Sequence, residues 1–168
     1  MCGFTILFKK KKFDRKQEFF SCSKLISYRG PDDNSYYEDE NIIMNFYRLS
    51  IQDLSIHGRQ PMCSQSKRYL IVFNGEIYNK LDIKSKYNFQ NLKSNTDTEI
   101  ILKLYERIKE KCLNYLDGMF SLVIYDKFKK KIFFARDRFG IKPLYYYHCE
   151  EYLFLSSEIK PIIKSNSV

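Results

Sequence analysis

The first segment of the chain constrains the fold most, because residues 2–8 form an apolar run that the lysines of residues 9–12 end at once. An apolar run of this length before a charged stretch predicts a buried strand. A secretory signal has its charges first and a longer apolar stretch after them. We therefore expect the N-terminus to lie in a sheet. We expect no export signal and no membrane span, since no run approaches the roughly 18 apolar residues that a span requires.

Further along the chain, strand-like runs alternate with segments of helical spacing. Strands are predicted over residues 42–49 and 69–73, and hairpins pair 119–125 with 131–135 and 144–147 with 152–155. Helices are predicted over residues 16–27, 77–86 and 157–164, and a further helix begins at Asn95 or Thr96. The Asn74-Gly75 dipeptide favours a tight turn that stops the 69–73 strand. This mixture predicts one layered α+β domain over residues 1–168.

The formal net charge of +9 raises the alternative of a nucleic-acid-binding protein. The lysines are spread along the sequence, however, and their one cluster, at residues 9–12, lies between a predicted strand and a predicted helix. A solvated loop is the expected structure there. No RNA- or DNA-binding motif accompanies the cluster, so we expect neither a nucleic-acid nor a membrane partner.

The cysteines indicate a reducing compartment. There are five, an odd number, and no two are spaced as CxxC, so neither a disulfide framework nor a metal site is expected. Scattered reduced thiols are typical of a cytoplasmic protein. The two histidines, His57 and His148, leave a Cys–His dyad open, but neither lies in a recognisable motif and both are expected on the surface or in loops.

Cys2 is the first candidate for chemistry. If Met1 is removed, Cys2 carries a free α-amino group with a pKa of about 7.7–8.0 beside a thiol with a pKa of about 8.5. One residue then supplies both a nucleophile and a base. The alternative is a cysteine at position 2 by chance.

Acyl transfer to such a thiol also requires an oxyanion hole and charge partners for the substrate. The Asn74 side-chain amide and the Gly75 backbone N–H are candidates for the oxyanion hole, and an ordinary turn is the alternative. Arg48, at a strand end, could hold an α-carboxylate in a bidentate pair, and Asp97, at a helix start, an α-ammonium. A surface ion pair and helix capping are the respective alternatives.

Together these residues resemble the class II glutamine amidotransferases, and most of all the N-terminal glutaminase domain of glutamine-hydrolysing asparagine synthetases. The matching segments occur in the order found in that family and cover nearly the whole chain. They are MCG at residues 1–3, RGPD at 29–32, RLSIQDL at 48–54, GRQPM at 58–62, FNGEIYN at 73–79, TDTE at 96–99, LDGMF at 116–120, ARDRFGIKPL at 135–144 and SSEIK at 156–160.

The resemblance implies a four-layer αββα N-terminal nucleophile (Ntn) hydrolase fold. It implies hydrolysis of L-glutamine to glutamate and ammonia through a Cys2 thioester, with the oxyanion held by Asn74 and Gly75. The implied glutamine-binding residues are Arg48, Leu49, Ile51, Asn74, Gly75, Glu76 and Asp97. Arg48 would bind the α-carboxylate, Asp97 with Glu76 the α-ammonium, and Leu49 and Ile51 would contribute backbone groups.

The resemblance also implies a partner. Asparagine synthetases continue into an ATP-pyrophosphatase domain with a Ser-Gly-Gly-x-Asp-Ser loop, which residues 1–168 lack. We expect ATP and Mg only in that domain, and no cofactor or metal in this one. The chain is then a piece of a longer protein, a truncated gene product or a stand-alone glutaminase that serves a synthetase subunit, and a homodimer is allowed. The ammonia acceptor is expected to be aspartate, with a sugar or another carboxylate as the alternative.

Two positions depart from the family pattern, which commonly has His where this chain has Tyr28 and Phe46. Neither position carries the nucleophile or a charge clamp, so we expect altered packing and intact chemistry. A glutamine sensor without catalysis is the remaining alternative, and the intact set of Cys2, Arg48, Asn74, Gly75 and Asp97 argues against it.

Overall fold

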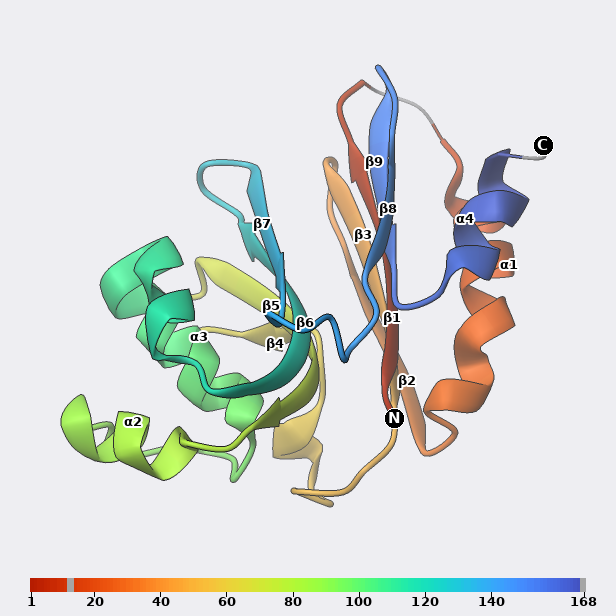
Figure 1. The fold of residues 1–168 in the computed structure, drawn as a ribbon. Helices are drawn as coiled ribbons and strands as arrows, with labels where there is room; N and C mark the ends of the chain where they lie inside the picture. The colour runs from red at the N-terminus through yellow and green to blue at the C-terminus, as the bar shows by residue number, and fades with distance from the viewer. Residues whose placement is uncertain (12–13, 167–168) are drawn as a thin grey trace. The chain divides into compact units, whose positions relative to one another are not determined.

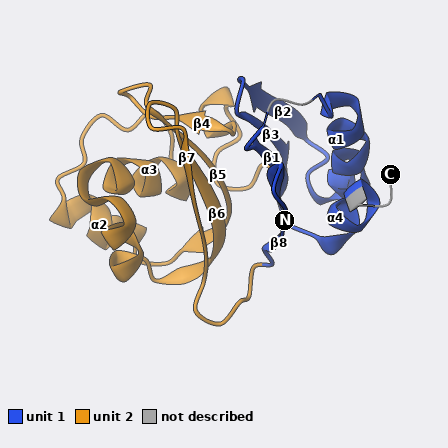
Figure 2. Ribbon diagram, turned by 90° about the horizontal axis from the view of Figure 1, so that it is seen from above, with its two compact units in different colours: residues 1–49, 143–168 blue, residues 50–142 orange. Residues whose placement is uncertain are grey.

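The computed structural model describes residues 1–11 and 14–166 and divides into two compact units (Figures 1 and 2). Unit 1 holds residues 1–49 and 143–168, and unit 2 holds residues 50–142. Lys12, the last lysine of the N-terminal cluster, lies outside the described residues. Each unit consists of one antiparallel sheet with helices packed on it, so the α+β class predicted from the sequence is confirmed.

The sheet of unit 1 has the strand order β2-β3-β1-β9-β8 among the described residues. Its strands are β1 (Gly3–Lys9), β2 (Asp33–Glu38), β3 (Ile42–Arg48), β8 (Tyr145–His148) and β9 (Tyr152–Ser156). The apolar N-terminal run is the central strand, paired with β3 on one side and β9 on the other, as its composition predicts. The edge strand β2 was not predicted, because it begins with three short polar residues, Asp-Asn-Ser.

Helices α1 (Lys16–Ser23) and α4 (Ile159–Asn166) lie on one face of this sheet (Figure 1). Side chains of a strand alternate between the two faces. Leu7 and Ile43 point to the helical face, where they pack with Phe19 and Cys22 of α1. The helix predicted over residues 16–27 is α-helical only to Ser23 and continues as a 3₁₀ helix, η1 (Lys24–Arg29).

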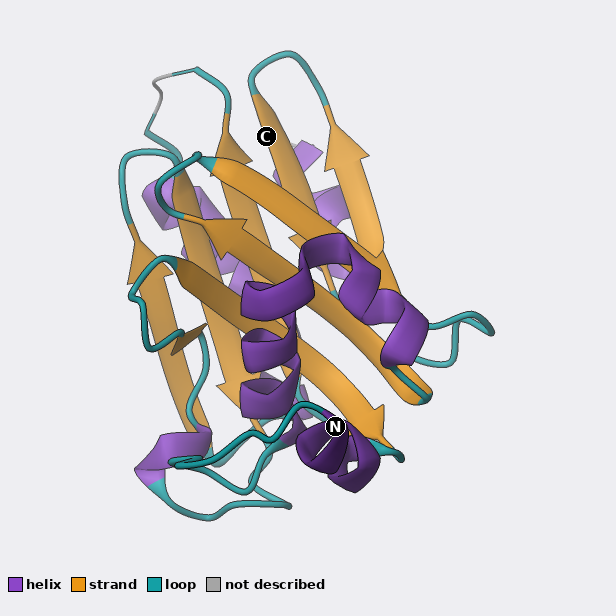
Figure 3. Cartoon of the chain, turned by 90° about the vertical axis from the view of Figure 1, so that its left-hand side faces the viewer, coloured by secondary structure: helices purple, strands orange, loops and turns teal. Residues whose placement is uncertain are grey.

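The sheet of unit 2 has the order β4-β5-β6-β7 in the part of the chain that the structure describes. Its strands are β4 (Met62–Cys63), β5 (Tyr69–Ile77), β6 (Gly118–Asp126) and β7 (Lys131–Arg136). The helical segments are η2 (Ile56–Gly58), α2 (Lys80–Lys86), α3 (Asp97–Ile108) and η3 (Lys109–Tyr115). Helix α3 lies across one face of the sheet (Figure 3), where its Ile101 and Leu104 pack with Ile71 and Phe73 of β5.

The turn predicted at Asn74-Gly75 is wrong, because β5 continues through both residues to Ile77 and pairs with β6 along its whole length. The glycine has a different reason. A Cβ placed on Gly75 would lie 2.2 Å from the carbonyl oxygen of Met119 on β6, so a larger residue would push the two strands apart. Because β5 extends to Ile77, the helix predicted from residue 77 begins only at Lys80.

Helix α3 is the element that the sequence predicts best. Ile100, Ile101, Leu104 and Tyr105 are buried as expected, and Ile108 packs partly buried at the edge of the same cluster. None of the helices in the described ranges has both the length and the apolar character to span a membrane.

Candidate active site

In unit 1, the half-buried Cys2 side chain is held at the point where β3 ends. The backbone N–H of Leu49 donates to Cys2 Sγ over 3.3 Å, and the thiol lies 3.5 Å from the carbonyl oxygen of the same residue. The Cys2 carbonyl accepts a hydrogen bond from Arg29 Nε over 3.0 Å. Contacts to both the side chain and the backbone therefore fix the position of the thiol.

Arg29 in turn is held by Glu158, whose Oε1 lies 3.0 Å from Arg29 Nη1. The Tyr28 hydroxyl donates to the same carboxylate. Burial raises the pKa of the Glu158 carboxyl, but the hydrogen bonds from Tyr28 and Arg29 outweigh burial and bring this pKa below its usual value. Tyr28, one of the two departures from the family pattern, thus joins the charged group that holds the Cys2 backbone.

Arg48 is the last residue of β3 and is buried. In the register of β1 and β3, Phe46 lies opposite Phe4, and strand alternation puts Arg48 on the same face as Phe46. This is the face opposite α1, since Ile43 points to that helix. Cys2 follows the same alternation as Phe4, so the candidate nucleophile and the candidate carboxylate clamp belong to one face of the sheet. Phe46, the second departure, is fully buried on that face.

In unit 2, Asn74 carries a buried amide with no partner. The side chain is 4% exposed, and Nδ2 has no hydrogen-bond partner among the described residues. Asn74 and Glu76 point to the face opposite Phe73, which packs under α3. A buried donor without an acceptor costs roughly 1–3 kcal/mol. An amide kept in this state is suited to a substrate oxygen, as an oxyanion hole requires.

The Gly75 N–H points out of the sheet ladder. The backbone N–H of Phe120 donates to Asp137 Oδ2 over 3.1 Å, and its carbonyl accepts from the Asp137 N–H over 2.8 Å. Both backbone groups of Phe120 are thus bonded to Asp137 and not to β5. Opposite residues in an antiparallel ladder exchange either both backbone hydrogen bonds or neither, so Phe120 and its partner Gly75 form a non-hydrogen-bonded pair. The Gly75 N–H therefore points to the same edge of β5 as that of Ile77, which donates to Asp97 Oδ2.

Asp97 is 1% exposed at the start of α3. Its Oδ2 accepts from the Ile77 N–H over 2.8 Å and from Gln52 Nε2 over 3.0 Å. Its Oδ1 lies 2.9 Å from Lys80 Nζ as an ion pair but has no partner in hydrogen-bond geometry. The side chain of Thr96, the residue before the helix, makes no capping hydrogen bond. The Asp97 carboxylate accepts hydrogen bonds from β5 and from Gln52, so it connects β5 to the loop at Gln52.

The remaining predicted residues are exposed. The Glu76 side chain is exposed on β5, and Ile51 is 74% exposed in the loop that follows β3. The structure therefore groups Cys2, Arg48 and Leu49 within unit 1. It groups Asn74, Gly75, Glu76 and Asp97 around the end of β5 within unit 2.

The sequence did not single out three side chains that contact these groups: Arg29, Gln52 and Lys80. Arg29 and Gln52 lie in two of the matching motifs, RGPD and RLSIQDL, and membership of these motifs could have marked them as site residues. Lys80 lies just outside the FNGEIYN segment, and no pattern marks it.

Three other cysteines and histidines of the described chain can be compared with Cys2 as candidates for the chemistry: Cys22, Cys112 and His148. Burial raises the pKa of the Cys112 thiol in unit 2 to about 12 and also raises the pKa of the Cys22 thiol in unit 1, so burial disfavours the reactive thiolate form of both. His148 pairs with Leu153, which lies opposite Phe8 at the far end of β1. Phe8 lies six residue steps along the strand from Cys2, a distance of about 20 Å, so a dyad of His148 with Cys2 is excluded.

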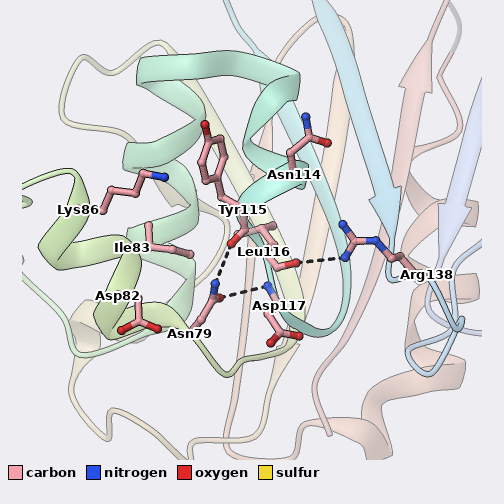
Figure 4. A pocket seen from close by; sticks show the side chains of 9 residues that line it. All are labelled: Asn79, Asp82, Ile83, Lys86, Asn114, Tyr115, Leu116, Asp117 and Arg138. Carbon is pink, nitrogen blue, oxygen red and sulfur yellow. Dashed lines mark hydrogen bonds between the residues drawn. The ribbon is translucent and has the colours of Figure 1, made fainter.

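Unit 2 also has an open cavity of about 400 Å³ between α2 and the end of η3 (Figure 4). Asn79 Nδ2 donates to the Tyr115 carbonyl over 2.9 Å, and the Asp117 N–H donates to Asn79 Oδ1 over 3.1 Å. Arg138 donates to the Leu116 carbonyl over 3.4 Å. These groups bond one another, and none of the predicted site residues lines the cavity.

Comparison with known proteins identifies the family. The family model described as "Glutamine amidotransferase domain" matches residues 1–168. Asparagine synthetase [glutamine-hydrolyzing] 2 of Bacillus subtilis is 44% identical over 140 residues, which are 82% of this chain and 18% of the relative. Asparagine synthetase B [glutamine-hydrolyzing] of Escherichia coli is 34% identical over 167 residues, 97% of this chain and 30% of the relative. The chain thus spans less than a third of the length of either relative.

Among solved structures, glutamine phosphoribosylpyrophosphate amidotransferase from B. subtilis superposes with a TM-score of 0.79 at 15% identity, covering 98% of this chain and 44% of that one. A second, described as the allosteric regulatory enzyme of purine biosynthesis, has a TM-score of 0.73, also at 15% identity, and covers 98% of this chain and 43% of that one. At this identity the likeness shows the fold alone. It confirms the predicted αββα Ntn-hydrolase fold. Taken by itself, each unit has one antiparallel sheet with helices packed on one face.

Proposed function

Because the chain belongs to the glutamine amidotransferase family, we propose that residues 1–168 act as one glutaminase domain with Cys2 as its nucleophile. The observation that carries the proposal is the Asn74 amide, a buried donor that has no hydrogen-bond partner in the described residues. The next residue on the same strand, Gly75, directs its backbone N–H away from the β5–β6 ladder. Two donors next to each other on one strand are what a tetrahedral oxyanion requires.

The reaction begins once Met1 has been removed. The Cys2 α-amine takes the thiol proton, and Sγ attacks the carboxamide carbon of glutamine. Asn74 Nδ2 and the Gly75 N–H hold the negative oxygen of the intermediate. The amine returns the proton to the leaving nitrogen, so ammonia departs and a γ-glutamyl thioester remains on Cys2. Water, deprotonated by the same amine, then releases glutamate and restores the thiol.

The substrate is held at its two charged ends. Arg48 binds the α-carboxylate, because a guanidinium offers two parallel N–H donors to a carboxylate. Asp97 binds the α-ammonium with help from Glu76, and backbone groups of Leu49 and Ile51 complete the pocket. This clamp demands an L-amino acid with a free α-amino group.

For the whole protein we propose ammonia supply to an ATP-dependent amidation, with aspartate as the acceptor and asparagine as the product. The support is the activity in the names of three relatives, two from B. subtilis and one from E. coli, each a glutamine-hydrolysing asparagine synthetase. The partner is then a synthetase domain or subunit, which alone binds ATP and Mg. Five free cysteines support a location in the cytoplasm. A homodimer would add mass in sedimentation experiments, which test that point separately.

The test is glutamate release from L-glutamine by the purified chain and by Cys2→Ala. We expect turnover only in the first, and glutamine binding, measured by calorimetry, in both. Hydrolysis that persists in Cys2→Ala would remove Cys2 from its role. Binding without turnover in the unmodified chain would favour the glutamine-sensing alternative.

A further inference from the structure

Lys80, the first residue of α2, lies against the carboxylate proposed to bind the substrate ammonium. Its Nζ is 2.9 Å from Asp97 Oδ1, and the side chain of Lys80 is 29% exposed against 1% for Asp97. The other carboxylate oxygen, Oδ2, already accepts from the Ile77 N–H and from Gln52 Nε2. Oδ1 has no hydrogen-bond partner in the described residues, so it is the oxygen left to receive a new N–H donor.

We propose that Lys80 is a resident cation that competes with the α-ammonium of glutamine for Asp97 Oδ1 and thereby sets the KM of the domain for glutamine. The inference rests on the proposed function, because it takes Asp97 as the ammonium-binding group. In this proposal Lys80 weakens the binding of glutamine, whereas the other residues of the proposed site strengthen it.

Two arrangements satisfy Asp97 when a substrate ammonium arrives, and both give the same sign. In the first, the Lys80 ammonium swings into water on its flexible four-carbon stem, and the substrate binds at the expense of an existing ion pair. In the second, both cations stay beside one carboxylate and repel each other. Removing the charge of Lys80 therefore favours the substrate in either case.

The size of the effect follows from the exposure of Lys80. A partly exposed ion pair changes a binding constant by roughly two- to five-fold, because water and salt screen it. We therefore expect Lys80→Gln to lower the KM for glutamine by about two- to five-fold with kcat unchanged. A glutamine analogue without the α-amino group leaves the Lys80–Asp97 pair intact, so its KM should not change.

The control is Lys84→Gln, which removes the same charge from the exposed side of the same helix. Lys80→Arg keeps the charge and should keep the KM of the unmodified chain. Lys80→Met keeps the aliphatic stem and repeats the test if Lys80→Gln does not fold. All variants are made in the full chain, and melting temperatures are recorded beside the kinetics.

The outcomes separate this inference from the proposed function. A lower glutamine KM in Lys80→Gln than in Lys84→Gln, with the deaminated analogue unaffected, supports the competition. An active chain in which Lys80→Gln and Lys84→Gln have equal KM values, or in which Lys80→Gln has the higher one, overturns it and leaves the glutaminase standing. An unmodified chain that neither binds nor hydrolyses glutamine overturns the proposed function, and the inference about Lys80 with it.

Discussion

Replacing Asn74 by alanine separates an oxyanion-hole donor from a structural residue, because only the structural role predicts a clear loss of stability. The Asn74 amide is 4% exposed, and its Nδ2 has no partner among the described residues. Removing an unpaired buried donor relieves a cost of roughly 1–3 kcal/mol, while the small cavity left behind costs a similar amount. We therefore expect the free energy of unfolding of Asn74→Ala to stay within about 1 kcal/mol of the original.

Activity should respond very differently. Losing one oxyanion donor typically removes about 2.7–4 kcal/mol of transition-state stabilisation, which is a decrease of about 10²–10³-fold in kcat. The matched control is Ser121→Ala. Ser121 lies opposite Asn74 on β6, is fully buried and also has an unpaired side-chain oxygen in the described chain. Steady-state glutamate release and urea unfolding measure the two quantities. Equal losses of kcat in both variants, or unfolding of Asn74→Ala alone, would refute the reasoning.

Three further predictions concern the clamp, the strand and the pH dependence. Arg48→Ala should raise the KM for glutamine by roughly 10- to 100-fold, because it removes a hydrogen-bonded pair of charged groups. Hydrolysis of an amide without the α-carboxylate should not change, and equal losses on both substrates would make Arg48 structural. Gly75→Ala should lower the melting temperature markedly, since its Cβ would lie 2.2 Å from the Met119 carbonyl oxygen, and an unchanged melting temperature would contradict the register of β5. Burial raises the pKa of the Asp137 carboxyl, but four backbone N–H donors outweigh burial and lower this pKa below its usual value. The contribution of the ionised Asp137 carboxylate to the free energy of unfolding is therefore present above about pH 4, and it is lost as the pH falls through the folded-state pKa of Asp137. Asp137→Asn should be less stable at neutral pH and lose less stability on acidification, which urea unfolding at several pH values measures.

The sequence predicted those elements in which local pattern and tertiary packing agree. An apolar run made β1 the centre of its sheet, and a one-sided stripe made α3 cover the other sheet. It failed where pairing overrides local preference. Asn74-Gly75 has the composition of a tight turn, but β6 pairs with it throughout, and the glycine serves the close approach of the Met119 carbonyl.

Site residues were predicted from motifs, and their partners were not. Gln52 and Asp97 are 45 residues apart in the chain, and only the fold brings the amide to the carboxylate. The Lys80–Asp97 pair likewise depends on the end of β5 lying beside the start of α3. Periodicity and spacing report the environment of a residue along its own element, so contacts between distant elements are outside their reach.

Cys2 acting as an N-terminal nucleophile is the central claim, and the intact mass of the purified chain, paired with glutamate release from the same sample, tests it most directly. We predict a mass lower by one methionine residue together with glutamate formed from L-glutamine. Full hydrolysis by a chain that retains Met1 would contradict the claim, because the α-amine of Cys2 would then be an amide and unable to relay the proton.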